Sequence, residues 1–184
     1  MSNEKTTKKT AVVRLCFCAS AVALAAVTSL VRLYSFPFGG SVTLCSMFFI
    51  MLPSYFFGFW EGAACGLVCG LIQFGISPYF LTLPQFLLDY ILAFSVMAVA
   101  AFFRNKKRGL LLGYIAAVFA RWAVATLAGL AWVHLGSVAW EGWSPLPYSM
   151  AYNAAYIFTE AAVTALIIAQ KPVERAVERV KAML

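Results

Sequence analysis

Long apolar runs alternate with short polar segments along this chain, and the pattern predicts six membrane-spanning helices. A helix needs about 20 consecutive apolar residues to cross a bilayer, and most of the runs approach that length. The second run contains Pro53 and is marginal for a straight span, so we expect a short, kinked helix there. The six predicted spans cover residues 15–31, 42–58, 60–76, 83–103, 110–133 and 148–169.

Two of the remaining segments carry clear local signals. Pro37, Gly39 and Gly40 break helices and predict a loop over residues 34–41. The final segment, residues 171–184, places apolar residues at helical spacing among charged ones. This spacing predicts an amphipathic helix that lies on the membrane surface.

Composition supports a membrane protein. Of the 184 residues, 63% are apolar and 11% are charged, whereas soluble domains have about 25% charged residues. A water-soluble fold cannot hide so much apolar surface, so we expect an all-α integral membrane protein. We expect a single membrane domain over residues 1–184, with a polar tail at 1–10, the bundle at 11–170 and the amphipathic tail at 171–184.

Basic residues gather on one side of the predicted bundle. The positive-inside rule places such segments in the cytoplasm, so we expect both termini to be cytoplasmic. An even number of spans agrees with this, and the net charge of +7 needs no nucleic acid to explain it. The basic residues are Lys5, Lys8, Lys9 and Arg14, the cluster at 104–108, and Lys171, Arg175, Arg179 and Lys181.

Small residues predict close packing between helices. Glycines recur every four residues through the third span, which puts a thin stripe of backbone on one helix face. In the first span, Ala19 and Ala23 stand four residues apart, a spacing that would let another helix approach closely, but spacing alone favours an ordinary Ala-rich helix. The five cysteines all lie in apolar runs, and we interpret them as small buried hydrophobic residues rather than disulfide partners or zinc ligands. The glycines are Gly58, Gly62, Gly66 and Gly70, and the cysteines are Cys16, Cys18, Cys45, Cys65 and Cys69.

Asp89 is the one formal charge between Glu61 and Arg104. A carboxylate is costly in lipid and usually lines a cavity or a pairing site, so it is a functional-site hypothesis by default. The alternative is a structural carboxylate that pairs with another helix.

Helix rise, about 1.5 Å per residue, sorts the polar residues of the spans by depth. An outer layer collects an acid, aromatic rings and an amide from three spans. Arg121 and Glu160 fall near mid-membrane, and we expect them to form a structural ion pair, because each alone would be expensive there. The outer layer comprises Asp89, Tyr90, Trp132, Tyr148 and Asn153.

This outer layer suits a flat small molecule that is cationic or carries an amine. Aromatic faces attract cations, and a carboxylate supplies hydrogen-bond acceptors and countercharge. Each member also has an ordinary structural alternative. Trp132, Trp143 and Tyr148 are compatible with an aromatic belt at the interface, and Asn153 with a bond between helices.

Three stretches and one arginine carry a family resemblance. They are Gly39–Leu44 (GGSVTL), Leu83–Phe94 (LPQFLLDYILAF), Glu141–Asn153 (EGWSPLPYSMAYN) and Arg121. With them, the chain resembles the thiamine-specific substrate-binding subunits of energy-coupling-factor (ECF) vitamin transporters, over about residues 14–170. The resemblance implies six helices, a site near the outer surface under the first loop, and a bacterial plasma membrane. It also implies a membrane coupling subunit and two ATPase subunits as partners.

The resemblance also implies roles for particular residues. The family's alanine docking face falls at Ala19 and Ala23. The residues implied for thiamine binding are Asp89, Tyr90, Trp132, Tyr148 and Asn153, and we add Gln85, Trp143 and Tyr34 as candidates.

One position departs from the family pattern. Ala125 stands where the family commonly has a histidine four residues after the arginine. Thiamine, its pyrimidine precursor and another flat heterocycle therefore all stay open as ligands. The chain has no phosphate-binding loop, so we expect no ATP hydrolysis. Asp89 has no second acid or histidine beside it in the sequence, so we expect no enzymatic activity, and we expect no cofactor or metal. The remaining alternatives are a stand-alone carrier or channel, an intramembrane enzyme and a purely structural membrane protein.

Overall fold

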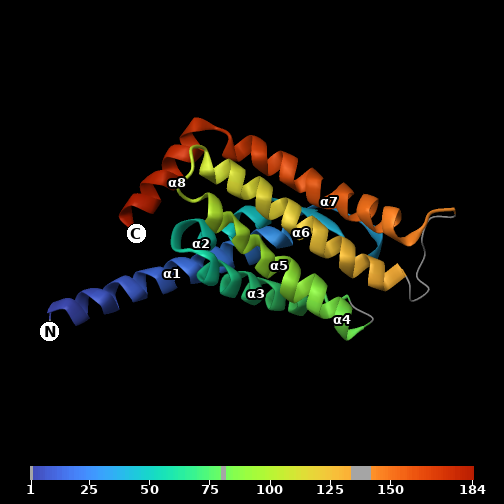
Figure 1. The fold of residues 1–184 in the computed structure, drawn as a ribbon, viewed down its shortest axis with the longest axis horizontal. Helices are drawn as coiled ribbons and strands as arrows, with labels where there is room; N and C mark the ends of the chain where they lie inside the picture. Colours follow the sequence, from blue (N-terminus) through green and yellow to red (C-terminus); the bar gives the residue numbers. More distant parts are fainter. Residues whose placement is uncertain (1, 80–81, 134–141) are drawn as a thin grey trace.

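The computed structural model describes residues 2–79, 82–133 and 142–184, without the side chains of residues 2–9 and 131–133. Apolar helices form a bundle, and a short antiparallel hairpin covers one end (Figure 1). The fourth span is one continuous helical segment built of four stretches with different hydrogen-bond patterns. The elements are α1 (Ser2–Leu30), β1 (Arg32–Ser35), η1 (Pro37–Gly39), β2 (Ser41–Thr43), α2 (Ser46–Phe57), α3 (Phe59–Ile76), α4 (Leu83–Phe86), η2 (Leu87–Leu92), α5 (Ala93–Ser95), η3 (Val96–Phe103), α6 (Gly109–Val133), α7 (Pro145–Ile168) and α8 (Lys171–Met183).

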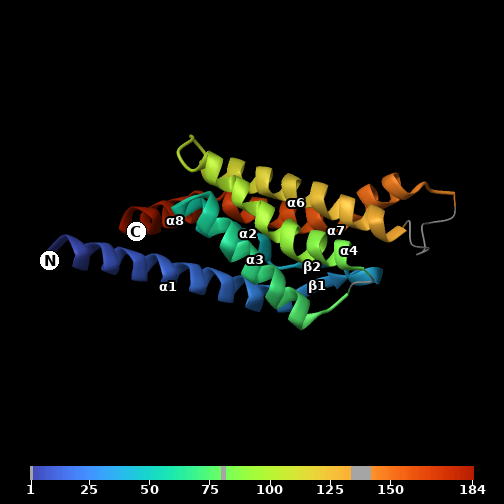
Figure 2. The same cartoon turned by 60° about the horizontal axis from the view of Figure 1, so that its bottom comes forward.

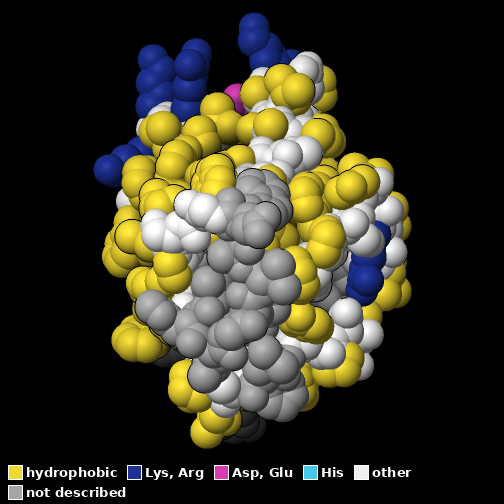
Figure 3. Space-filling model, turned by 90° about the vertical axis from the view of Figure 1, so that its right-hand side faces the viewer, with side chains coloured by type: hydrophobic (Ala, Val, Ile, Leu, Met, Phe, Trp, Pro, Cys, Tyr) yellow, Lys and Arg dark blue, Asp and Glu magenta, His cyan; other side chains and the backbone are white. Residues whose placement is uncertain are grey.

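Within the described residues, five helical segments are long and apolar enough to cross a membrane. The sixth, α2, has 12 residues and contains Pro53. The prediction of a bundle of six apolar helices with a short second member is therefore confirmed. Apolar side chains cover most of the flanks seen from the hairpin end, and Lys and Arg show at the upper margin and in one patch at the right (Figure 3). Such flanks suit a surface in contact with lipid.

The predicted boundaries near the hairpin are wrong. Residues 34–41 are not a simple loop, because β1 pairs with β2 in the register Tyr34↔Val42 and Ser35↔Ser41. The second helix begins at Ser46, not at Val42. In the apolar run that begins at Val42, composition alone does not distinguish a strand from a helix. The pairing is decided by the turn, where Gly39 has a φ of +94°.

The predicted glycine stripe packs α3 closely against its neighbours. A Cβ atom on Gly62 would overlap Ser54 of α2, and one on Gly66 would meet the carbonyl oxygen of Phe94 at 2.5 Å. A Cβ atom on Gly70 would overlap the carbonyl oxygen of Tyr90. The absence of side chains here lets the fourth span lie directly on α3.

The fourth span changes its helical pattern beside this contact. Leu87–Leu92, which contains Asp89 and Tyr90, is a π-helix, and Val96–Phe103 is a 3₁₀ helix. π-helical turns are rare and occur frequently at functional sites. Nothing in the pattern of apolar and polar residues indicated either change.

Both chain termini lie at the end of the bundle opposite the hairpin (Figures 1 and 2). There α8 turns back onto the bundle and buries Val177. The helix over residues 171–184 is thus confirmed as an element, while its position relative to a membrane stays a prediction.

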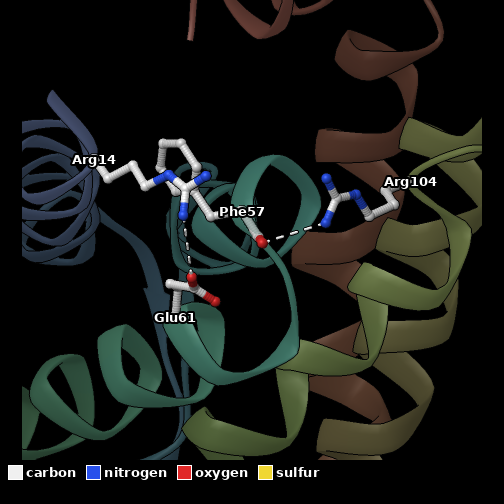
Figure 4. Close-up of polar contacts among 4 residues, drawn as sticks. All are labelled: Arg14, Phe57, Glu61 and Arg104. Carbon is white, nitrogen blue, oxygen red and sulfur yellow. Dashed lines mark hydrogen bonds and ion pairs between the residues drawn. The ribbon is translucent and has the colours of Figure 1, made fainter. Parts of the chain in front are cut away.

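Polar contacts fix the α2–α3 junction at this same end (Figure 4). Arg14 Nη1 lies 3.9 Å from Glu61 Oε1, and the Arg14 guanidinium lies 5.7 Å from the centre of the Phe57 ring. Arg104 Nη1 donates a hydrogen bond of 3.2 Å to the Phe57 carbonyl. These contacts tie α1, α3 and the end of η3 together around Gly58, which has a φ of +130°.

Candidate functional site

A cavity of about 170 Å³ lies under the hairpin. Its walls come from the hairpin, α3, the fourth span, α6 and α7, so no single element forms it. The residues that line it include Phe38, Gly40, Gln73, Tyr79, Gln85, Asp89, Tyr90, Phe94, Arg121, Ala125, Tyr148, Ser149, Tyr152, Asn153, Tyr156 and Glu160.

Asp89 is half-buried and lines this cavity. The amide nitrogen of Gln85, one helical turn earlier, lies 3.5 Å from Asp89 Oδ2 and donates to it. Gln85 is itself buried, at 4% exposure, so this donor is held in place. No cation of the described chain lies within ion-pair distance of the Asp89 carboxylate.

Tyr90, the next residue, anchors residues 77–79, which follow α3. Its hydroxyl donates to the Ser77 carbonyl at 3.0 Å and accepts from the Tyr79 amide nitrogen, also at 3.0 Å. The edge of the Phe74 ring packs against Tyr90, with 5.2 Å between ring centres. Tyr90 therefore connects the cavity wall to residues 77–79.

Tyr148 and Asn153 bring α7 into the site. The Tyr148 ring is buried and stacks on Tyr152, with the ring centres 6.2 Å apart and the planes at 22°. The Asn153 amide nitrogen donates to the Ser149 carbonyl at 2.9 Å and to the Ala125 carbonyl at 3.3 Å. Asn153 thereby joins α7 to α6 and supplies an amide to the cavity lining.

The hairpin is held over the cavity by Tyr152. The Gly40 amide donates to the Tyr152 hydroxyl at 3.0 Å, and that hydroxyl donates to the Pro37 carbonyl. A Cβ atom on Gly40 would lie 2.7 Å from the Tyr152 oxygen and 2.9 Å from a ring carbon of Tyr156. Glycine is needed here because the backbone just before β2 lies directly on these two rings.

The predicted ion pair between Arg121 and Glu160 is wrong. Both residues line the cavity, but no salt bridge joins them in the described structure. The Arg121 guanidinium lies 4.3 Å from the centre of the Phe94 ring, and its Nη1 lies 3.9 Å from the sulfur of Met97. Arg121 thus makes a cation–π contact with Phe94 in place of the expected ion pair with Glu160.

The Glu160 carboxylate instead accepts hydrogen bonds from residues at the start of the second apolar segment. Its Oε2 accepts from the Thr43 amide at 3.2 Å and from the Thr43 hydroxyl at 2.6 Å. Its Oε1 accepts from the Ser46 hydroxyl at 3.0 Å and the Met47 amide at 3.2 Å. The first amides of a helix have no partner within the helix, so the N-terminus of α2 accounts for part of this arrangement.

The other predicted site residues fall in different places. Tyr34 is 60% exposed and Trp143 is 46% exposed, and neither lines the described cavity. Trp132 belongs to α6, but its side chain lies outside the described residues. On α1, Ala19 and Ala23 are exposed, whereas the bundle buries Ala21 and Ala25.

Several residues that line the cavity were not predicted from the sequence. Tyr152 and Tyr156 continue from Tyr148 at four-residue spacing, so a tyrosine ladder along one face of α7 was visible in the sequence. Ser149 lies one turn before Asn153 on the same helix. Within the described residues, no group of three Cys, Asp or Glu side chains could hold a metal ion.

The fold and the cavity define the class: a polytopic helical membrane protein with a cavity under a hairpin at one end. The family described as "Thiamine transporter protein (Thia_YuaJ)" matches residues 15–178. The chain therefore belongs to this thiamine transporter family, which confirms the resemblance seen in the sequence. Members of the family are transporters, so the chain is a multi-pass membrane protein of thiamine uptake and not an enzyme.

Two relatives support this assignment. The thiamine transporter ThiT of Bacillus subtilis (strain 168) is 34% identical over 148 residues, which cover 73% of this chain and 76% of that protein. A solved structure of ThiT from Listeria monocytogenes superposes with a TM-score of 0.63 at 26% identity. The superposition covers 86% of this chain and 92% of the Listeria chain.

Proposed function

We propose that this chain captures thiamine in the cavity under the hairpin and delivers it to the cell interior through an ATP-driven ECF complex. Family membership supports thiamine as the ligand. The observation that carries the choice of cavity is the Asp89 carboxylate, which opens into an aromatic-walled space without a cation of the described chain at ion-pair distance.

The chemistry of the cavity matches that of thiamine. Thiamine carries a permanent positive charge on one ring and an amino group on the other. Asp89 supplies a charged hydrogen-bond acceptor and a countercharge. Tyr148, Tyr152 and Tyr156 offer ring faces for a flat cation, and Asn153 lines the same cavity.

Delivery requires the partner complex in this proposal. By the positive-inside rule, the basic segments near both termini support cytoplasmic termini, and the hairpin end would then face outside. The exposed Ala19 and Ala23 give α1 a smooth outer face on which a helix of the coupling subunit would dock. The chain itself has no phosphate-binding loop, so two ATPase subunits would supply the energy.

Ala125 supports a second candidate ligand. This residue is 4% exposed and lines the cavity with a methyl group. The family pattern commonly has a histidine at this position. The missing ring removes a polar partner from the wall, so another flat heterocycle, such as the pyrimidine precursor of thiamine, is the second candidate.

A binding and transport experiment separates these candidates. The purified chain is titrated calorimetrically with thiamine, with the aminopyrimidine precursor and with biotin as an unrelated vitamin. We expect thiamine to bind most tightly and biotin not to bind. Tighter binding of the precursor would reassign the ligand. Thiamine uptake by liposomes that contain this chain alone would replace the ECF mechanism with a stand-alone carrier.

A further inference from the structure

Arg121 lies at the inner end of the proposed thiamine cavity. Three residues of α6, each four apart, line this cavity: Arg121, Ala125 and Gly129. Because α6 runs from the terminal end of the bundle toward the hairpin end, Arg121 is the deepest of the three (Figure 1). Its expected partner Glu160 accepts hydrogen bonds from Thr43 and the residues that follow it. A guanidinium at this depth therefore needs another acceptor.

Most donors of this guanidinium have no strong acceptor among the described residues. An arginine carries five N–H donors. The hydrogen bond of Arg121 goes to the sulfur of Met97, 3.9 Å from Nη1, and a thioether is a weak acceptor. The Phe94 ring, 4.3 Å from the guanidinium, attracts its charge. No carboxylate of the described chain lies within 4.0 Å of it. Donors of Arg121 are therefore available to a ligand.

Ala125 leaves the guanidinium accessible from the rest of the cavity. It lies one helical turn closer to the hairpin on the same face of α6, and its side chain is a single methyl group. Side chains of a helix tilt toward its N-terminus, so a longer residue at this position would lean over Arg121. The inner end of the cavity thus presents a cation with unused donors.

The charge of Arg121 decides which part of a ligand suits this end of the cavity. A cation repels another cation, so the positively charged ring of thiamine is disfavoured beside it. The aminopyrimidine ring of thiamine is neutral, and its two ring nitrogens are hydrogen-bond acceptors. Asp89 lines the same cavity and would accept a hydrogen bond from the amino group of that ring. Arg121 and Asp89 together match the acceptor and donor groups of an aminopyrimidine.

We propose that Arg121 is a specificity-determining residue of this site, which donates a hydrogen bond to a ring nitrogen of the aminopyrimidine of the ligand. The inference rests on the proposed function. It applies equally to thiamine and to its pyrimidine precursor, because both carry this ring. In this chain the guanidinium supplies the polar contact for which Ala125 has no atom.

The test compares two arginine variants and three ligands. Arg121→Met removes the charge and the five donors and keeps an unbranched side chain beside Phe94 and Met97. Arg32→Met is the matched control, because Arg32 also lines the cavity but is exposed on β1. The ligands are thiamine and its two pyridyl analogues, each of which has C–H in place of one pyrimidine nitrogen. Both analogues keep the cationic ring and the amino group, so the acceptor alone changes.

Isothermal titration calorimetry of the full chain in detergent measures the dissociation constants. For the unmodified chain, we expect one analogue to bind about ten-fold more weakly than thiamine, because a hydrogen bond to a charged donor is lost. Arg121→Met should weaken thiamine binding by a similar factor, so that thiamine and this analogue then differ by less than about two-fold. Arg32→Met should keep the discrimination between the two ligands.

Repulsion alone predicts the opposite sign. If Arg121 makes no contact with the ligand, removal of its charge should strengthen the binding of cationic thiamine. Tighter thiamine binding in Arg121→Met would therefore overturn the proposal, and so would discrimination that survives in this variant. Equal affinity of the unmodified chain for the three ligands would also overturn it, whether or not the variant folds. If the unmodified chain bound neither thiamine nor the precursor, the proposed function would itself be refuted, and this inference with it.

Discussion

Replacing Asp89 by asparagine tests the carboxylate on which the proposed thiamine site depends. The change keeps the shape of the side chain and removes its charge. The new amide would still have Gln85 as a neighbour, since the present contact is a single hydrogen bond of 3.5 Å. No ion pair is broken, because no cation of the described chain lies within 4.0 Å of the carboxylate. We therefore expect the bundle to fold as before.

The size of the effect follows from the ligand contacts that the carboxylate would make. A hydrogen bond to a charged group contributes about 1.5–3 kcal/mol when both partners are removed from water. Each 1.4 kcal/mol changes an equilibrium constant about ten-fold. The dissociation constant for thiamine should therefore rise by about 10- to 150-fold in Asp89→Asn.

Isothermal titration calorimetry with the purified, ligand-free chain measures this change. Glu61→Gln is the matched control, because Glu61 is a carboxylate at the opposite end of the bundle, where it pairs with Arg14. Its thiamine affinity should stay within about two-fold of the unmodified chain. An affinity within about three-fold in Asp89→Asn, with an unchanged melting temperature, would refute the role that we give to this carboxylate.

Three further changes test the packing and the partner face. Glu160→Gln places an amide nitrogen against the hydrogen-bond donors of Thr43 and its neighbours. It should lower the free energy of unfolding by about 1.5–3 kcal/mol and lower the melting temperature in detergent. Gly70→Ala should cost about 1–3 kcal/mol, because the new methyl would overlap the Tyr90 carbonyl, whereas Gly75→Ala meets nothing within 4 Å and should leave the melting temperature unchanged. Equal melting temperatures for these two glycine variants would contradict the packing argument. Ala23→Trp should keep thiamine affinity and abolish ATP-driven uptake in liposomes that contain the partner complex; normal uptake would remove Ala23 from the docking face.

Prediction from the sequence was most accurate where residues of one kind recur along one face of a helix. The glycine spacing in α3 identified a close helix contact, and the structure places Tyr90 and Phe94 of the fourth span against it. The apolar runs predicted both ends of α3 and the start of α6 to within about one residue. Periodicity works here because a helix brings every third or fourth residue to the same face, whatever the neighbouring elements are.

The sequence failed where residues far apart in the chain meet. Arg121 and Glu160 were paired by depth and opposite charge, yet Glu160 bonds to Thr43, Ser46 and Met47 more than 110 residues earlier. The hairpin donors and the N-terminus of α2 were invisible as partners, because the run from Val42 was interpreted as one helix.

The sequence by itself determined that this chain is a helical membrane protein of six apolar segments, and its motifs determined the family. Both follow from local quantities: apolar length, charge density and residue identity at fixed spacing. Only the tertiary structure decided which side chains share the cavity, that a hairpin covers it, and that Glu160 holds this hairpin while Asp89 stays open. Those outcomes depend on which donors and rings from distant segments reach a given carboxylate, and no spacing along a single helix encodes that geometry.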